Sequence, residues 1–171
     1  MADANVTFFL GGARSGKSRL AQAMAETLPL RLVYLATGQA FDAEMADRIG
    51  RHRADRGPRW RTVECPIDLP AAVAREAVAG TVVLVDCLTL WASNVLLAAG
   101  DADAASAALQ AALGAAAGPV IIVSNEVGLG IVPENALARQ FRDIAGRLHQ
   151  DVAAMADAVF FVAAGLPIRM K

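Results

Sequence analysis

The sequence predicts an α/β domain with a mostly parallel sheet that helices cover on both faces. Short apolar runs rich in β-branched residues alternate with longer helical patterns, and no Pro-, Gly- or Ser-rich linker divides the chain. Most of these runs are apolar throughout, as in strands that are buried on both faces, and parallel strands need helical crossovers between them. We therefore expect residues 1–171 to form a single domain.

Each element follows from its own pattern. Apolar runs predict strands at residues 6–10, 32–36, 60–64, 81–86 and 120–124. Helical patterns are found at residues 18–27, 43–53, 69–78 and 133–156, with an alanine-rich surface helix and its turns within 101–118. Pro133 suits the first turn of the last helix, where its missing N–H costs nothing. Residues 158–162 and 168–171 are expected to form a hairpin across Gly165, Leu166 and Pro167.

The composition excludes several classes of protein. Hydrophobic residues make up 56% of the chain, charged residues 19%, and the formal net charge is −1. A disordered chain has lower hydropathy, and a nucleic-acid binder is usually basic. No apolar run reaches the ~18 residues of a membrane span, and the first residues lack the basic segment of a signal peptide. Cys65 and Cys87 lack metal-ligand spacing, so we expect small buried hydrophobes in a reducing, cytoplasmic compartment.

Residues 11–18 fit the pattern GxxxxGKS, which binds nucleotide phosphates when it joins a strand to a helix. The loop consists of Gly11, Gly12, Ala13, Arg14, Ser15, Gly16, Lys17 and Ser18. Glycines let backbone N–H groups face a phosphate, and the helix start adds its positive dipole end. Lys17 is expected to reach the β- and γ-phosphates, and the Ser18 hydroxyl to ligate Mg²⁺. Only Lys17 and Lys171 among the sixteen basic residues are lysine, which indicates a specific need for an ammonium group here.

Asp86 ends the strand predicted at residues 81–86, and so lies at the edge where ligands bind in open α/β sheets. It is a candidate to hold Mg²⁺ through water or to contact nucleotide or substrate. The alternative is that it caps the following helix.

Three further polar segments carry candidate residues. Thr37 directly follows the second strand, whose end we expect to lie near the loop, and it either bonds a phosphate or ribose or caps a turn. His52 lies in the basic run 48–56, which is either a solvated helix face or a catalytic segment. Glu126 opens a glycine-containing loop and is either an acid–base group or a turn residue.

Three other residues, His149, Trp60 and Trp91, are expected to be structural.

The whole chain resembles the bifunctional adenosylcobinamide kinase / adenosylcobinamide-phosphate guanylyltransferase family of cobalamin biosynthesis. Motifs in the family's order carry this resemblance: GGARSGKSR at 11–19, YLATGQ at 34–39 followed by DAEM and RI, WRTVECP at 60–66, VDCLTLWASNVLL at 85–97, SNEVGLGIVPEN at 124–135 and RQFRDIAGRLHQ at 139–150. The resemblance implies a RecA-like P-loop sheet, a homotrimer, and two reactions. One phosphorylates adenosylcobinamide with a nucleoside triphosphate, and the other transfers GMP from GTP to the resulting phosphate.

The resemblance also implies roles for particular residues. His52 stands at the position of the family's guanylylated histidine. Nucleotide contacts are implied at the P-loop and at Ala36, Thr37, Gly38, Arg53, Ala54, Asp55, Arg56, Glu64 and Asp86. ATP, GTP and Mg²⁺ are the expected nucleotides and metal. Two other interpretations stay open: a P-loop kinase or NTPase without a covalent intermediate, and a nucleotide-responsive binding protein, which would need switch loops and a partner surface.

Overall fold

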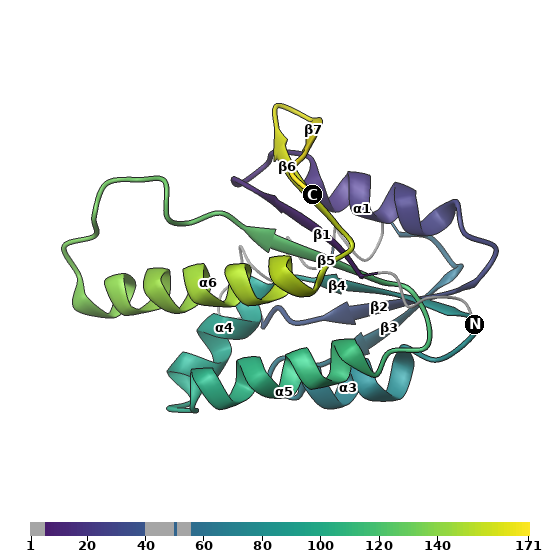
Figure 1. The fold of residues 1–171 in the computed structure, drawn as a ribbon, viewed down its shortest axis with the longest axis horizontal. Coiled ribbons are helices and arrows are strands. Elements are labelled where there is room, and N and C mark those ends of the chain that lie inside the picture. The colour runs from purple at the N-terminus through teal and green to yellow at the C-terminus, as the bar shows by residue number, and fades with distance from the viewer. Residues whose placement is uncertain (1–5, 40–49, 51–55) are drawn as a thin grey trace.

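The computed structural model describes residues 6–39, 50 and 56–171. They form a seven-stranded sheet in the order β3-β2-β4-β5-β1-β6-β7 (Figure 1). The strands are β1 (Val6–Gly11), β2 (Arg31–Ala36), β3 (Trp60–Glu64), β4 (Thr81–Asp86), β5 (Val120–Asn125), β6 (Ala158–Ala163) and β7 (Leu166–Arg169). All pairings are parallel except that of β6 with β7. The predicted fold class, a mostly parallel sheet with helices on both faces, is confirmed.

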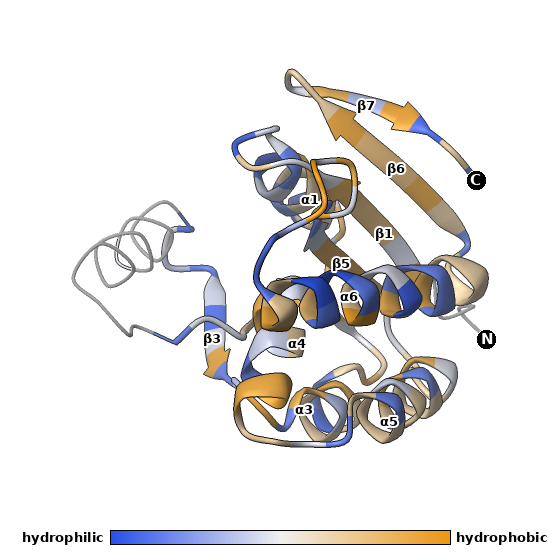
Figure 2. Ribbon diagram, turned by 90° about the vertical axis from the view of Figure 1, so that its left-hand side faces the viewer, coloured by the Kyte–Doolittle hydropathy of each residue, from blue (hydrophilic) through white to orange (hydrophobic). Residues whose placement is uncertain are grey.

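The helices of the described part are divided unequally between the two faces. They are α1 (Lys17–Glu26), α3 (Leu69–Glu76), α4 (Leu88–Leu97), α5 (Ala102–Gly114) and α6 (Ala136–Met155). The last four pack over one face in a large core that includes Trp91 and Leu109. α1 packs over the other face, where Ala21 and Ala25 lie against the strands in a smaller core. The side view shows α1 apart from the other four helices (Figure 2).

Most strands lie where the apolar runs predict them, with residues 60–64 and 81–86 matching as predicted. The C-terminal hairpin is also confirmed, although β7 begins at Leu166 and its Pro167 pairs with Val162. That proline is tolerated because β7 is an edge strand. The predicted helix over residues 43–53 lies outside the described residues, apart from Gly50.

Two helices differ from the prediction. The last helix begins at Ala136, because the Asn135 side chain accepts the N–H of Ala138 and acts as the N-cap. Pro133 therefore lies before the helix, and the prediction that it occupies the first turn is wrong. No helix was predicted at residues 88–97, where the structure has α4.

Within the described residues no helix is both long and apolar enough to span a membrane.

Candidate functional site: the carboxyl edge of the sheet

The carboxyl ends of five neighbouring strands form a row at one edge of the sheet. Gly11 pairs with Asn125, and Ala36 pairs with both Asp86 and Glu64. Strands lie about 4.8 Å apart, so the row from Gly11 on β1 to Glu64 on β3 spans roughly 19 Å. These positions also share the face that α1 covers, because paired residues of parallel strands point to the same side. The row thus brings the loop and both predicted acids to one edge and one face.

The strand order corrects the predicted distance between the second strand and the loop. Two strands, β4 and β5, separate β2 from β1. The end of β2 is therefore roughly 14 Å from the end of β1. Asp86 is closer, because only β5 stands between β4 and β1. The structure thus places Asp86 closer to the loop than Ala36 and Glu64, which lie further along the row.

The loop after β1 has the backbone of a phosphate cradle. Gly16 has a φ of 96°, in the left-handed region that favours glycine. A Cβ on Gly11 would lie 2.4 Å from the carbonyl oxygen of Val162, so this close approach of two strands also needs glycine. The hydroxyl of Ser15 is buried and has no hydrogen-bond partner among the described residues. An orphaned buried donor beside glycine-rich backbone fits a loop that receives an anion.

The C-terminal hairpin supports this loop from outside the motif. The N–H of Gly165, in the turn between β6 and β7, donates to the carbonyl oxygen of Ser15 at 2.8 Å. A Cβ on Gly16 would lie 3.2 Å from the Cα of Gly165, so the two turns are in contact. No motif marks this contact in the sequence, because the two segments lie about 150 residues apart.

Lys17 points into the site although it opens α1. Its side chain is buried, and its ammonium group donates to the carbonyl oxygen of Gly12 at 3.0 Å. Its charge also reaches Cys87, the residue after Asp86. Burial and the charge of Asp86 raise the pKa of the Cys87 thiol to about 11, and Lys17 opposes that shift. The ammonium group therefore lies between the loop and the end of β4, where it would meet a bound phosphate chain.

Thr37 belongs to the framework beneath the site. It is fully buried, and its hydroxyl both accepts the N–H of Cys87 and donates to the carbonyl oxygen of Cys87, each at 2.8 Å. The peptide bond between Asp86 and Cys87 is cis. The amide of Asn94 on α4 donates to the carbonyl oxygens of Thr37 and Pro66. The hydroxyl of Thr37 thus ties the end of β2 to the residue after β4, which is a structural role but not the turn cap named as the alternative to a nucleotide contact.

Arg56 and Tyr34 form the other end of the site. The guanidinium carbon of Arg56 lies 3.5 Å from the centroid of the Tyr34 ring. Both side chains are buried, and Trp60 meets the Tyr34 ring edge-on at 6.3 Å. Burial and the neighbouring Asp86 carboxylate raise the pKa of the Tyr34 phenol above its ordinary range. Arg56 is thus fixed at the same edge as Asp86, while Tyr34 is a site residue that the sequence did not single out.

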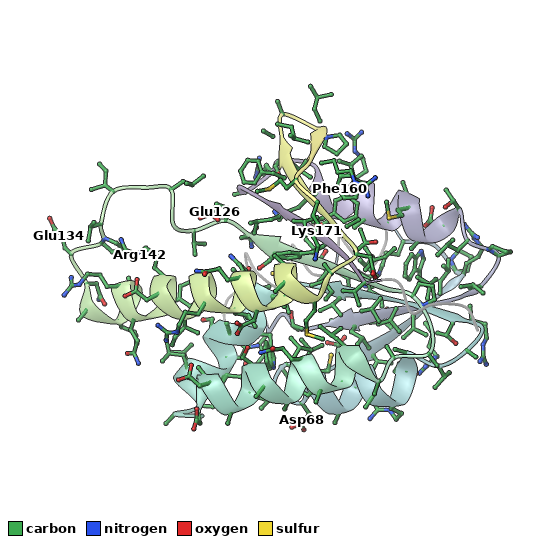
Figure 3. The ribbon with its side chains drawn as sticks, in the orientation of Figure 1. Asp68, Glu126, Glu134, Arg142, Phe160 and Lys171 are labelled. Atoms are coloured by element: carbon green, nitrogen blue, oxygen red, sulfur yellow. The ribbon has the colours of Figure 1, made fainter. Side chains whose placement is uncertain are left out.

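The segment after β5 is built by turn and capping contacts. The backbone N–H of Glu126 donates to the carbonyl oxygen of Gly11, and its carboxylate accepts the N–H of Gly128. This favours the turn alternative for Glu126, which Figure 3 shows at the start of the long loop that leads to Glu134. Asn125 donates its amide to the hydroxyl of Thr89 at 3.0 Å. Asn125 therefore links the end of β5 to the first turn of α4.

His149 is structural, as expected. It lies on α6, and its Nε2 is 2.7 Å from the hydroxyl of Ser124, on the face opposite the row. Burial lowers the pKa of its imidazole, and the charge of Glu126 partly offsets that shift. Cys65 and Cys87 are buried free thiols, and Trp91 is a core residue whose indole donates to the carbonyl oxygen of Ile67.

Several predicted site residues lie outside the described residues: His52, Arg53, Ala54 and Asp55. Ala13, Arg14 and Glu64 are exposed at the row, and Gly38 follows Thr37 with partial exposure.

Among the described residues, no three His, Cys, Asp or Glu side chains gather to hold a metal ion. The donors that remain for Mg²⁺ are the partly exposed Ser18 hydroxyl and the Asp86 carboxylate. Oxygen ligands of this kind suit Mg²⁺, which usually keeps several waters and phosphate oxygens.

The sheet order, the loop and the acid two strands away define a P-loop nucleotide-binding protein of the α/β class. Solved structures agree with this fold. An ATPase from the type III secretion system of pathogenic bacteria superposes with a TM-score of 0.56 over 96% of this chain, at 14% identity; the match spans 56% of that ATPase. A protein of Pyrococcus horikoshii superposes with a TM-score of 0.58 over 98% of this chain and 86% of its own, at 8% identity.

Sequence relatives give the family. Residues 7–170 match the model of the cobinamide kinase / cobinamide phosphate guanyltransferase family. The bifunctional adenosylcobalamin biosynthesis protein CobP of Pseudomonas aeruginosa is 50% identical over 95% of both chains. The corresponding protein CobU of Salmonella typhimurium is 42% identical over 94% of this chain and 97% of its own. The chain therefore belongs to the cobinamide kinase / cobinamide phosphate guanyltransferase family, a family of enzymes, and the resemblance found in its motifs is confirmed.

Proposed function

We propose that this protein phosphorylates adenosylcobinamide and then transfers GMP from GTP to adenosylcobinamide phosphate, giving adenosyl-GDP-cobinamide, in the cytoplasm. The observation that carries the proposal is the family match over residues 7–170 on a chain whose phosphate loop and acid share one sheet edge. A row of roughly 19 Å offers room for a nucleotide and a second substrate side by side.

The kinase step uses the loop end of the row. A hydroxyl oxygen of adenosylcobinamide attacks the γ-phosphorus of ATP or GTP, the bond to the β-phosphate oxygen breaks, and the hydroxyl proton passes to solvent or a base. Backbone N–H groups of residues 11–18 hold the phosphates, and the ammonium group of Lys17 neutralises charge that develops on them. Lys17 is suited to this role because its ammonium group lies between the loop and the end of β4.

Mg²⁺ fits the donors at this end of the row and supplies charge neutralisation on the transferring phosphate when bound. The hydroxyl of Ser18 would ligate it directly. The carboxylate of Asp86, two strands from the loop, would hold it through water. This division follows from the register, because Asp86 is roughly 10 Å from the β1 end.

Guanylyl transfer passes through His52. A neutral imidazole nitrogen attacks the α-phosphorus of GTP, a P–N bond forms, and pyrophosphate leaves as its P–O bond breaks. A phosphate oxygen of adenosylcobinamide phosphate then attacks the same phosphorus and displaces the imidazole. Arg53, Ala54, Asp55, Arg56 and Glu64, with Ala36 and Gly38 on either side of the buried Thr37, line the nucleotide. Arg56 supports this assignment because its guanidinium is held over the ring of Tyr34, near the carboxyl end of β2.

Product analysis tests the two reactions directly. The protein is incubated with adenosylcobinamide and ATP, then with GTP, and the corrinoid products are identified by mass spectrometry. We expect a gain of one phosphoryl group in the first incubation and of one GMP in the second. Phosphorylation without GMP transfer would reduce the function to that of a plain P-loop kinase. Binding of nucleotide with neither product would leave a nucleotide-responsive binding protein.

We also infer that the protein associates, as a homotrimer by the family resemblance. The loop between β5 and α6 exposes Leu129, Ile131 and Val132, with 97% of the Ile131 side chain accessible. This loop extends away from the body of the fold in Figure 1. Neighbouring exposed apolar side chains are typical of contact surfaces between proteins. Light scattering after size exclusion should give three times the 17.8 kDa chain mass, whereas a monomer at micromolar concentration would contradict association.

A further inference from the structure

Tyr34 is a buried tyrosine at the site for which neither the loop motif nor the phosphate chemistry gives a role. It lies two residues before the end of β2 and is 7% exposed. Its register partners are Thr62 on β3 and Leu84 on β4, so it points to the same face as Asp86. The ring therefore lies directly beneath the part of the row that runs from Asp86 to Glu64.

The hydroxyl of Tyr34 lies at the same part of the row as an acid. Asp86 stands two residues beyond Leu84, the register partner of Tyr34 on the neighbouring strand, so the two side chains are diagonal neighbours on one face, and the charge of Asp86 contributes to the raised pKa of the phenol. A phenol with its ordinary pKa of about 10 keeps its proton at neutral pH, so its hydroxyl can donate and the carboxylate can accept. A carboxylate has two oxygens with about four acceptor sites. If the Tyr34 hydroxyl donates to one side of the Asp86 carboxylate, the other acceptor sites of the carboxylate face the row. A hydrated cation would be held there.

The ring of Tyr34 holds the arginine. The Arg56 guanidinium carbon lies 3.5 Å from the ring centroid, which is the geometry of a cation–π contact. The Arg56 Nε is buried without a hydrogen-bond partner among the described residues, and its Nη2 reaches only the Thr62 hydroxyl, at 3.5 Å. Since the polar contacts of Arg56 with the described residues are few and long, the ring is the main support that the described part of the chain gives the guanidinium. Trp60, edge-on to the ring, fixes the ring in turn.

We propose that Tyr34 is a positioning residue that presets both ends of the nucleotide site, orienting the Asp86 carboxylate with its hydroxyl and the Arg56 guanidinium with its ring. This rests on the proposed function, in which Asp86 acts toward Mg²⁺ and Arg56 toward the nucleotide. Because the two supports come from different parts of one side chain, substitution can remove them separately.

The test measures the affinity of a fluorescent GTP analogue in Mg²⁺ and in EDTA, so it needs no turnover. Tyr34→Phe keeps the ring and removes the donor. It should leave the affinity in EDTA unchanged and reduce the gain from Mg²⁺ about fivefold, the size of one typical hydrogen bond. Tyr34→Met keeps most of the volume without a ring. It should also weaken binding in EDTA by roughly threefold or more, the size of a modest cation–π contact.

Two further variants separate positioning from packing. Arg56→Lys keeps the charge but cannot stack as a flat fork, so it should weaken binding in EDTA as Tyr34→Met does. Phe160 lies on the same face of the sheet and stacks on Phe9 at 5.1 Å, and its strand β6 is separated from β4 by β5 and β1. Phe160→Leu should keep wild-type affinity in both buffers, even if thermal melting shows lower stability.

The outcomes are distinct. An unchanged Mg²⁺ gain in folded Tyr34→Phe overturns the role of the hydroxyl. Wild-type affinity in EDTA for Arg56→Lys overturns the role of the ring, and this variant decides that point if Tyr34→Met does not fold. Losses of the same size in Phe160→Leu would show that packing alone is responsible. Wild-type protein that binds nucleotide as described, yet forms neither corrinoid product, contradicts the proposed function and leaves the role of Tyr34 standing.

Discussion

The two faces of the sheet differ in how much helix covers them. Four helices, α3 to α6, pack over one face and enclose the larger core, which contains Trp91, Leu109 and Leu148. α1 packs over the other face near β1, β4 and β5. Beyond α1, the ends of β2 and β3 carry Tyr34 and Glu64 at the carboxyl edge. We therefore expect the face under four helices mainly to supply stability, and the less covered face to receive the proposed ligands.

Polar residues follow the same division. On the face covered by four helices, Ser124 and His149 are buried and bonded to each other. On the α1 face, Lys17, Asp86 and Arg56 lie along the row that ends the strands. Buried polar groups that satisfy each other stabilise a fold, whereas charges gathered at a sheet edge are available to a ligand. Substitutions on the two faces should therefore affect different measurements.

Replacing Lys17 should have the largest effect on activity. Lys17→Ala removes the one ammonium group between the loop and β4, so phosphoryl and guanylyl transfer should fall about 10²–10³-fold while the melting temperature changes little. Lys171→Ala is the matched control. The Lys171 ammonium, labelled in Figure 3, donates to the carbonyl oxygens of Ala153 and Ala154 near the end of α6, and Lys171 pairs with Val159, at the end of the hairpin opposite the Gly165 turn that contacts the loop. Equal rates for wild type and folded Lys17→Ala would place the phosphate site elsewhere.

Truncating the larger core should have the opposite profile. Leu109 on α5 is fully buried. Leu109→Ala should lower the free energy of unfolding by about 2–5 kcal/mol, from lost burial and the cavity that remains. The Michaelis constants for nucleotide should not change in the folded protein. Urea denaturation and steady-state kinetics measure the two quantities, with the exposed Ala108→Ser as control. A large rise in the nucleotide Michaelis constant would show that this face is coupled to the site.

The sequence predicted the strands, the helix that follows the loop and the position of Asp86 at a strand end well, because each has a local signal. The pattern GxxxxGKS is contiguous, and a buried strand that ends in an acid is visible as four apolar residues before Asp86. The bounds of α4 were not predicted because this helix is buried on most of its sides, through residues such as Leu88, Trp91 and Val95. Its sequence therefore shows little difference between an apolar and a polar face.

The missed site contacts are long-range. Tyr34 and Arg56 meet only because β2 and β3 pair in one register. Gly165 supports Ser15 across almost the whole chain length. Such contacts depend on the strand order, which the sequence pattern did not give, and this is also why the second strand was expected too close to the loop. Asn135 could have been identified as the N-cap, but Pro133 offered an earlier start.

His149 should make stability depend on pH. Burial lowers the pKa of its imidazole in the folded protein, so it stays neutral there while the unfolded chain binds a proton below pH ~6.5. Above pH ~6.5 the imidazole is neutral in both states, and His149 does not reduce the free energy of unfolding. As the pH falls from ~6.5 toward the lowered pKa of the folded protein, the free energy of unfolding decreases by at most about 1.4 kcal/mol per pH unit. Urea denaturation at pH 5.5 and 7.5 should show a smaller difference for His149→Gln. The same pH dependence in both proteins would contradict this.

Replacing Asn135 at the start of α6 should have the smallest effect on stability, and the sign of that effect shows where the helix begins. Asn135→Ala removes the side chain that caps Ala138, which should destabilise the protein by about 1 kcal/mol. If the helix began at Pro133 instead, Asn135 would be interior, and alanine would stabilise it by a few tenths of a kcal/mol. Thermal melting distinguishes the two, with the exposed Glu134→Ala as the neighbouring control.

The central claim is that the open edge of the α1 face carries out a covalent nucleotidyl transfer. The most direct measurement is incubation with GTP labelled at the α-phosphate, followed by denaturation and mapping of the label by mass spectrometry. We predict a GMP adduct on His52 that survives alkali and is lost in acid, as expected of a phosphoramidate. It should be absent from His52→Ala and strongly reduced in Lys17→Ala. A label on another residue, or His52→Ala that keeps both the label and guanylyl transfer, would contradict the account.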